Sequence, residues 1–468
     1  MTHHQEPVHR TWLTSDRYVP TRFIRPARQF METEAAGGIV LLIAAIAAVI
    51  WANSPWWQSY FTFWETGLDL TIGSLHIEES LKEIVNDGLM AIFFFVVGME
   101  IKRELVSGEL NEIKKAALPA IAAVGGMVVP ALIYVAFVVG GGGGEAVQGW
   151  GIPMATDIAF SVGVIALLGS RISTGAKLFL LALAIVDDIG AILVIAVFYT
   201  EDLHFAWLGL AIGLLAAVLL ARKIGVRSVI FYLAVGVVIW FAFLESGVHA
   251  TIAGVVLGFM TPALALYSDD EFHRRATWIM ERWDMNRRSP DSAELLDHDA
   301  LELAAVSRES VSPLNRLEHS LHLWSSFFVI PVFALANAGV RFIGTDVVGA
   351  VLSPVALGVA VGLTLGKPIG IGVATWIGLK LNLGRLPART TMKTILGLGL
   401  LAGIGFTVSL FIAELAFTDV LLIREAKIGI FLGSAVAGTL GFLVLRAMKT
   451  PEAELEEARA SLAASAGD

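Results

Sequence analysis

Four ionisable residues stand inside otherwise apolar stretches of this sequence. Asp157, the adjacent pair Asp187 and Asp188, and Lys367 each lie near the middle of a segment long enough to cross a bilayer. A charged side chain inside a membrane costs a few kcal/mol, so it needs either a partner or a function. Three carboxylates and one ammonium leave excess negative charge, which must bind a cation or protons to become neutral. These residues therefore predict a cation site near the bilayer midplane.

Asp187 and Asp188 are neighbours, and their side chains leave a helix about 100° apart. Both can therefore border one cavity without facing the same way. Mutual repulsion and burial favour the protonated form of at least one carboxylate, so protons and a small hard cation compete for the same oxygens. Such competition is the minimum that exchange of a cation for protons requires. The simpler alternative is a structural ion pair, in which one aspartate and Lys367 only hold helices together.

Two of the apolar stretches contain helix breakers. Glycines and a proline interrupt residues 149–153, just before Asp157, and glycines recur over 397–405. Opposed, interrupted helices in two halves of a chain indicate an inverted-repeat transporter. Unwound helices would present positive N-termini and negative C-termini inside the membrane, which Asp157 and Lys367, respectively, could balance. Glycines alone would also fit ordinary close packing of membrane helices.

The composition of the whole chain points to a membrane protein. Of its 468 residues, 56% are hydrophobic and only 16% are charged, and the mean hydropathy is +0.73. Soluble domains do not need so much apolar material, so the bilayer is the expected solvent. The absence of cysteine excludes disulfides, thiolate metal sites and cysteine nucleophiles. A formal net charge of -9 argues against nucleic-acid binding.

Twelve apolar stretches approach the roughly 20 residues that a spanning helix needs. They run over residues 37–53, 83–101, 116–139, 147–169, 177–199, 205–221, 228–244, 248–266, 320–340, 353–379, 394–417 and 428–445. Lys and Arg alternate between the intervening loops as the positive-inside rule requires for twelve helices with both chain ends in the cytoplasm. One outer loop departs from this rule, because it holds Arg424 and Lys427.

The segments outside these stretches differ in composition. One loop mixes Arg, Asp, Glu and Ser with few apolar residues, so it is expected to be flexible or loosely helical, and the C-terminal tail is acidic and rich in alanine. The predicted organisation is a cytoplasmic tail at 1–36, a transmembrane domain at 37–446 with a long cytoplasmic loop at 267–316, and a second cytoplasmic tail at 447–468.

Several short motifs surround the membrane aspartates and Lys367. They are Ala155-Thr156-Asp157-Ile158-Ala159-Phe160, Ala184-Ile185-Val186-Asp187-Asp188-Ile189-Gly190-Ala191, Gly366-Lys367-Pro368 and Gly403-Ile404-Gly405-Phe406-Thr407. Together they resemble the NhaA-type sodium/proton antiporters, and the similarity runs from about Gly37 to Arg446. Further matching motifs begin at Asn86, Gly98, Ser246 and Ala336.

The resemblance implies an all-α polytopic membrane protein of twelve transmembrane helices, with inverted repeats and two crossed discontinuous helices, the NhaA fold. It implies electrogenic, pH-regulated exchange of sodium or lithium for protons by alternating access in the bacterial inner membrane. The residue matching Asp188 is the central ligand of cation and proton, with the Asp187 match beside it. Thr156 and Asp157 match the broken-helix positions, and Lys367 matches a midplane lysine that pairs with an aspartate or carries a proton.

The resemblance also suggests how the protein is regulated. In the family, pH regulation is associated with a cytoplasmic funnel. The residues that map onto it here are Glu100, Arg103, Glu104, His249, Glu318 and His322. His249 equally fits an interfacial histidine at a helix start. His319 and His322, spaced i,i+3, fit a polar helix face better than a metal site.

An outer hairpin joins protomers into a dimer in relatives, and segment 66–79 resembles it. Gly73 and Ser74 would form its turn, although an ordered loop fits this segment equally well. The loop 267–316 and the N-terminal tail are longer than the family pattern. These additions bear on regulation and leave the ion site unchanged.

Other functions fit the sequence less well. An intramembrane aspartyl protease needs two aspartates that share a proton, as Asp157 and Asp188 could, but a neighbouring Lys367 would keep both ionised. A solute symporter would have a roomier polar cavity, and a channel would have a wide polar lining or a filter. The sequence therefore predicts a secondary antiporter without enzymatic activity or cofactor, whose partners are Na+, Li+, protons, the lipid bilayer and a second copy of the chain.

Overall fold

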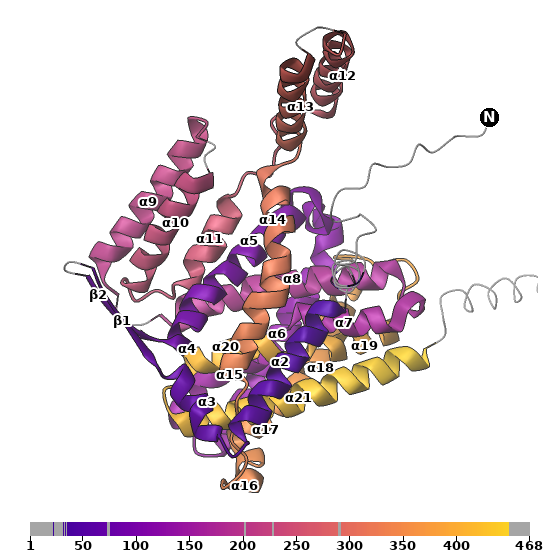
Figure 1. Ribbon diagram of the computed structural model, residues 1–468. Helices are drawn as coiled ribbons and strands as arrows, with labels where there is room; N and C mark the ends of the chain where they lie inside the picture. The colour runs from indigo at the N-terminus through magenta and orange to yellow at the C-terminus, as the bar shows by residue number, and fades with distance from the viewer. Residues whose placement is uncertain are drawn as a thin grey trace, which may run out of the picture. The chain divides into compact units, whose positions relative to one another are not determined.

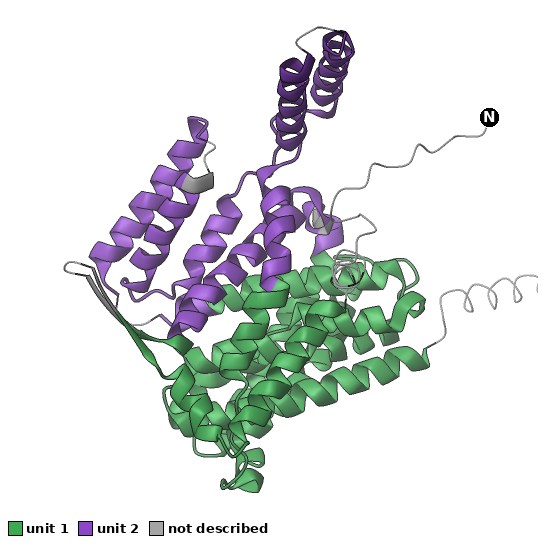
Figure 2. Cartoon of the chain, viewed as in Figure 1, with its two compact units in different colours: residues 1–82, 117–194, 326–468 green, residues 83–116, 195–325 purple. Residues whose placement is uncertain are grey.

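The computed structural model describes residues 35–72, 75–200, 203–226, 229–288 and 292–448, together with Arg22, Met31 and Thr33. The predicted tails at 1–36 and 447–468 thus lie almost entirely outside the described residues. Within the described residues the chain is mostly helical, with one pair of short strands (Figure 1). It divides into two compact units, residues 1–82, 117–194 and 326–468, and residues 83–116 and 195–325 (Figure 2).

The first unit contains the helices that carry the predicted ion site. Its elements are α2 (Ala36–Ala52), α3 (Trp57–Trp64), β1 (Gly67–Ile72), β2 (Leu75–Ser80), most of α6 (Ile113–Gly140), the 3-10 helix η5 (Gly144–Met154), α7 (Ile158–Leu168), most of α8 (Thr174–Phe198), α15 (Ile330–Asn337), α16 (Val347–Val351), α17 (Pro354–Val361), the π-helix η8 (Gly362–Gly366), α18 (Lys367–Lys380), α19 (Met392–Ala402), α20 (Phe406–Ala416) and α21 (Val420–Ala447).

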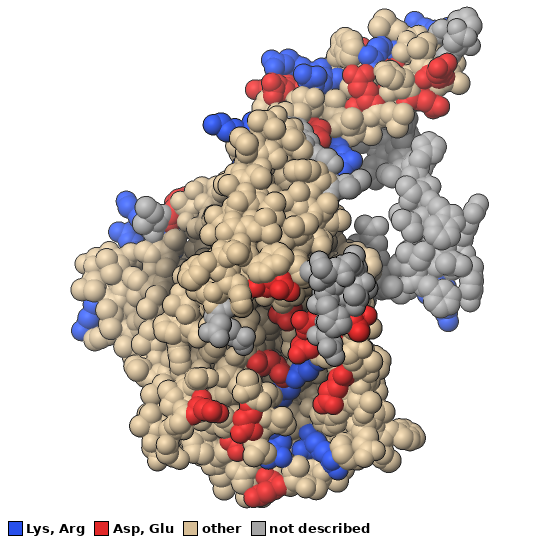
Figure 3. Space-filling model, turned by 90° about the vertical axis from the view of Figure 1, so that its left-hand side faces the viewer, with Lys and Arg blue, Asp and Glu red and all other residues tan. Residues whose placement is uncertain are grey.

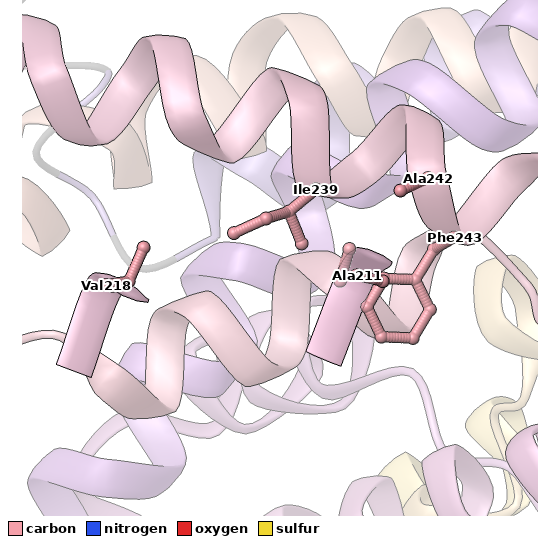
Figure 4. Packing of buried hydrophobic residues seen from close by; sticks show 6 residues of the cluster. Ala211, Val218, Ile239, Ala242 and Phe243 are labelled. Carbon is pink, nitrogen blue, oxygen red and sulfur yellow. The ribbon is translucent and has the colours of Figure 1, made fainter. Parts of the chain in front are cut away.

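The second unit holds the remaining spans and an elaborated loop. Its elements are the π-helix η3 (Ile84–Leu89), α5 (Met90–Ser107), α9 (Phe205–Lys223), α10 (Val229–Leu244), α11 (Thr251–Met260), α12 (Asp269–Asn286), α13 (Ser292–Glu309) and α14 (Pro313–Trp324). In α9, α10 and α11, apolar residues pack together: Ala211 and Val218 meet Ile239, Ala242 and Phe243 (Figure 4), and Ala253 joins them.

Length and apolar composition make many of these helices membrane spans. Among the described residues, seven helices are long and apolar enough to cross a membrane, or up to ten if each of three bent helix pairs counts as one span. Two further apolar helices, Phe231–Leu244 and Thr251–Met260, are shorter. Large apolar side chains such as Leu132 and Val197 are 63% and 68% exposed, as lipid-facing residues are. The chain is therefore a multi-pass membrane protein.

Close helix contact in the second unit depends on glycine. At Gly98, Gly254 and Gly258 an added Cβ would collide with the backbone of the facing helix, because α5 and α11 approach each other to backbone contact. Small residues permit this approach, which supplies van der Waals packing where lipid removes the hydrophobic driving force.

Segment 66–79 forms the strand pair that the sequence left open. β1 and β2 are antiparallel, with Gly67 opposite Ser80 and Ile72 opposite Leu75. The hairpin interpretation is therefore confirmed, and the predicted turn residues, Gly73 and Ser74, lie outside the described residues.

The loop 267–316 is more ordered than expected, because α12 and α13 pack as a helical hairpin. Arg282 bonds to the buried Asp299 at 2.6 Å and also to Glu302. Ser268 caps α12, and its N–H and hydroxyl hold the pKa of Glu271 below the usual value. Charged side chains gather on this hairpin, at the top of the view, and a second group of charged side chains lies in the lower half of the face shown (Figure 3).

The α5–α11 contact predicts that replacing glycine by alanine destabilises the protein at the contact and not elsewhere. Gly258→Ala should lower the melting temperature of the purified protein, because overpacking costs about 1–3 kcal/mol. Gly213→Ala in α9 is the matched control, because nothing lies within 4 Å of a Cβ added there. Equal melting temperatures for the two variants would contradict the close approach of α5 and α11.

Candidate functional site

Two interrupted helices meet in the first unit. η5 and α7 are separated by residues 155–157 and bend by 40°, and α19 and α20 are separated by residues 403–405 and bend by 50°. The two breaks touch, because the N–H of Asp157 donates to the carbonyl of Ile404 at 2.6 Å. The predicted interruptions are therefore present, and they lie against each other.

Asp157 caps the N-terminal ends at both breaks. One carboxylate oxygen accepts the N–H of Phe160 in α7 at 3.0 Å. The other accepts both the N–H of Thr407 in α20, at 3.1 Å, and its hydroxyl, at 2.6 Å. A carboxylate at a helix N-terminus satisfies free N–H groups and balances the positive end of the helix dipole. The geometry thus agrees with the charge-balancing role expected for Asp157.

Hydroxyl groups satisfy the carbonyls freed at the opposite ends. Thr156 donates to Ala402 at 2.8 Å, and Ser161 donates to Leu401 at 2.8 Å. In return, Ser409 of α20 donates to Ile152 of η5 at 2.7 Å. Because lipid offers no hydrogen bonds, unwound backbone inside a membrane protein needs such partners.

Lys367 forms a buried ion pair with Asp187. Its ammonium lies 2.5 Å from Oδ2 of Asp187 and donates to the Thr156 hydroxyl at 2.9 Å. Lys367 was expected to face helix C-termini. It reaches one of them through Thr156, whose hydroxyl in turn donates to the last residue of α19. A chain of contacts therefore runs from Asp187 to the break between α19 and α20.

The site combines deep burial with excess negative charge. Thr156, Asp157, Asp187, Asp188 and Lys367 are all buried, with exposed fractions between 0% and 6%. Asp187 and Asp188 lie near the middle of α8, and Asp188 is close enough to Lys367 to interact electrostatically. With all four side chains ionised, three negative charges and one positive charge would be buried in this region, which leaves two negative charges in excess. A site of this charge in a low-dielectric interior takes up protons or a cation.

One carboxylate oxygen of Asp187 is left open. Oδ2 is held by Lys367, whereas Oδ1 is buried and receives no hydrogen bond from any described residue. A buried oxygen without a donor calls for an explanation, such as a ligand that binds there. A structural ion pair explains only one of the two oxygens, so pairing with Lys367 does not by itself account for the site.

Several residues predicted for the pH-regulatory funnel meet in the second unit. Arg103 in α5 pairs with Glu318 of α14 and lies 3.6 Å from Glu104. Glu100, one turn earlier on α5, interacts electrostatically with these three residues. His322 lies one turn after Glu318 and is exposed, and it also interacts electrostatically with Arg103.

His249 lies two residues before the start of α11. It is half-buried, and its carbonyl accepts the N–H of Ile252. This position fits a histidine at a helix start, which was the alternative interpretation of the residue.

The sequence interpretation missed a second buried charged group. Glu414 of α20 binds Lys82, just after β2, and Lys427 of α21, each at 2.6 Å. Glu414 lies inside the apolar stretch 394–417, so the rule that identified Asp157 also identifies it. Lys427 was counted as an outer-loop charge that departed from the positive-inside rule. Its burial against Glu414 shows that it is a paired residue of α21, which removes this part of the discrepancy.

The hydroxyl caps predict a stability difference between two buried serines. Ser409→Ala leaves the Ile152 carbonyl without its hydroxyl, which should cost about 1–3 kcal/mol and lower the melting temperature. Ser434→Ala is the control, because the Ser434 hydroxyl is buried but makes no hydrogen bond to any described residue. A melting temperature no lower for Ser409→Ala than for Ser434→Ala would contradict the capping role.

Comparison with known proteins identifies the family of this chain. The family model "Na+/H+ antiporter 1" matches residues 28–445. A protein of Koribacter versatilis named Na(+)/H(+) antiporter NhaA is 48% identical over 90% of this chain and 91% of its own length. A protein of Sorangium cellulosum named Na(+)/H(+) antiporter NhaA 2 is 45% identical over 96% of this chain and 97% of its own length. A protein of Oleidesulfovibrio alaskensis named Na(+)/H(+) antiporter NhaA is 44% identical over 91% of this chain and 95% of its own length. The resemblance is confirmed: the chain belongs to the Na+/H+ antiporter 1 family, whose members are secondary transporters and not enzymes.

Proposed function

We propose that this protein exchanges sodium ions for protons across the bacterial inner membrane. The observation that carries the proposal is the open Oδ1 of Asp187, buried next to Asp188 while Lys367 holds the other oxygen. Carboxylate oxygens are the ligands that a small hard cation prefers. The names of the relatives supply the choice of sodium and protons.

The mechanism follows from competition at these oxygens. Sodium bound between Asp187 and Asp188 expels a proton from the site, and protonation removes the charge that holds sodium. Asp157 and Thr156 complete the proposed site from the break beside it, Asp157 by fixing both helix N-termini and Thr156 by its bond to Lys367. Alternating access then exposes the same oxygens to one side of the membrane at a time.

The proposed architecture is the twelve-helix NhaA fold with inverted repeats and two crossed discontinuous helices. Seven long spans, three bent pairs and two shorter apolar helices support this number. The bent pairs at η5–α7 and α19–α20 are the proposed discontinuous helices. Both chain ends and the loop 267–316 are placed in the cytoplasm by the positive-inside rule.

Electrogenic exchange and transport of lithium are further parts of the proposal. Lithium is also a small hard cation and fits the same carboxylate oxygens. An excess of protons over sodium requires a second group that releases a proton in each cycle. Lys367 either is that group or stays paired with Asp187 throughout the cycle. The first role is possible because Lys367 contacts Asp187 directly, so sodium that binds Asp187 can displace the ammonium.

Regulation and assembly are assigned to other parts of the chain. Glu100, Arg103, Glu104 and Glu318 form a cluster in which protonation of one carboxyl changes the pairing of the others. We assign pH regulation to this cluster, with His322 and His249 as its further proposed members. Among the described residues the sheet consists of β1 and β2 alone, and the edges of a two-stranded sheet favour pairing with a second copy, so the hairpin is the proposed homodimer contact.

Sodium-triggered collapse of a preformed pH gradient in everted membrane vesicles tests the exchange. Wild type should respond to sodium and lithium but not to potassium, and Asp188→Asn should not respond at any pH from mildly acidic to alkaline, because a neutral amide cannot exchange a proton for a cation. Asp299→Asn, in the α12–α13 hairpin, is a control for replacing a buried aspartate outside the site. A wild-type response retained in Asp188→Asn would remove this mechanism.

Removing the ammonium tests the role of Lys367. Lys367→Ala should weaken exchange or make its rate independent of membrane voltage, since one titrating group is lost. Initial rates in proteoliposomes at imposed potentials measure this. Lys380→Ala, at the other end of α18, is the control and should remain voltage-sensitive. If Lys367→Ala exchanges at the wild-type rate with wild-type voltage sensitivity, then Lys367 takes no part in the cycle.

A further inference from the structure

Glu414, Lys82 and Lys427 form a charged cluster outside the proposed ion site. Each lysine nitrogen lies 2.6 Å from a different oxygen of Glu414. The side chains of Glu414 and Lys427 are both 8% exposed, whereas that of Lys82 is 30% exposed. The cluster therefore joins α20 to α21 and to the start of α4 (Leu81–Glu83) through largely buried ion pairs.

Stability alone does not explain such a cluster. The desolvation of buried charges usually offsets their attraction, so apolar residues of similar size would hold the helices at least as well. A buried ion pair instead fixes geometry, because removal of one partner leaves an uncompensated charge. The helix that carries Glu414 is a place where geometry matters, since α20 is half of an interrupted span.

α20 is short and needs anchors of its own. It has 11 residues, and residues 403–405 separate it from the hydrogen-bond ladder of α19. Near its N-terminal end, Thr407 binds the carboxylate of Asp157. Glu414 follows seven residues later, about 10 Å along the axis and on nearly the same helix face. The cluster therefore holds the C-terminal end of α20, and the bond from Thr407 to Asp157 holds its N-terminal end.

We propose that Glu414 is a positioning residue, which together with Lys427 and Lys82 fixes the place of α20 and so keeps Thr407 on Asp157. The inference rests on the proposed function, because it assigns the cluster an effect on sodium binding at the adjacent site. Glu414 touches neither ion nor proton in this scheme and acts only through the helix.

Burial divides the roles of the two lysines. Lys427 is enclosed with Glu414, so this pair is the permanent and electrically neutral part of the cluster. Lys82 is partly exposed and can leave Glu414 without stranding a buried charge. Replacing Glu414 alone would leave the buried ammonium of Lys427 unpaired, which is costly, so the informative variant removes both charges of the permanent pair together.

The first test is the KM for sodium, set against the maximal rate per folded protein, in proteoliposomes. Glu414→Gln/Lys427→Met should raise the KM about two- to thirtyfold, the range expected for residues that influence a site from a distance. Lys82→Met should raise it less, and Lys82→Arg should restore it. Glu112→Gln/Lys115→Met removes an exposed ion pair and is the matched control. A lower yield of folded protein with an unchanged KM would overturn the proposal.

A second readout does not depend on transport. The rings of Phe160 in α7 and Phe406 in α20 are in contact, with centroids 5.8 Å apart, and the chain has no cysteine. Cross-linking of Phe160→Cys/Phe406→Cys by a short bifunctional maleimide therefore reports the position of α20. Glu414→Gln/Lys427→Met in this background should slow cross-linking, and an unchanged rate would overturn the positioning role. Absence of sodium exchange by wild type would refute the proposed function instead, and the cross-linking result would still decide the role of the cluster.

Discussion

The structure of the site depends on the need to satisfy backbone polar groups where two membrane helices are interrupted. Each break frees N–H groups on one side and carbonyls on the other, and lipid can pair with neither. The two breaks pair with each other, through the bond from Asp157 N–H to Ile404 and through the hydroxyls of Thr156, Ser161 and Ser409. This mutual pairing fixes where the Thr156 hydroxyl lies, and thus where Lys367 and Asp187 meet.

The same constraint divides the work of the three membrane aspartates. Both carboxylate oxygens of Asp157 accept hydrogen bonds from N–H groups at helix N-termini, so its charge balances helix dipoles. One oxygen of Asp187 accepts a hydrogen bond from Lys367, and the other accepts none from the described residues. Asp188, its neighbour on α8, adds the negative charge that the single ammonium cannot balance. In the proposed function, this remaining charge is what sodium and protons compete to neutralise.

Buried charges recur in the first unit at a place with no helix break. Glu414 holds one lysine inside the protein and one at its edge, and it lies on the same short helix as Thr407. Ion pairs of this kind cost desolvation energy and give directional contacts in return. A half-helix that lacks the hydrogen-bond ladder of its other half gains most from such contacts. The proposed positioning role follows from that need.

The sequence alone determined which residues are out of place in a membrane and which helices are interrupted, because charge and glycine or proline inside an apolar stretch are visible without any tertiary information. It therefore predicted Asp157, Asp187, Asp188 and Lys367 and the positions of the breaks, whereas it left a hairpin and an ordered loop equally open at 66–79. Family resemblance added the exchange reaction. The same charge rule applies to Glu414, which lies inside the apolar stretch 394–417.

Only the tertiary structure decided which groups pair. The sequence gives no means to choose among three aspartates as the partner of Lys367, because the choice depends on how α8, α18 and the break at Thr156 approach in space. It likewise could not show that Lys427 is buried against Glu414, since burial depends on what packs around a residue and not on its place near a span end. Periodicity and composition report the environment of one helix, whereas pairing is a property of several helices together.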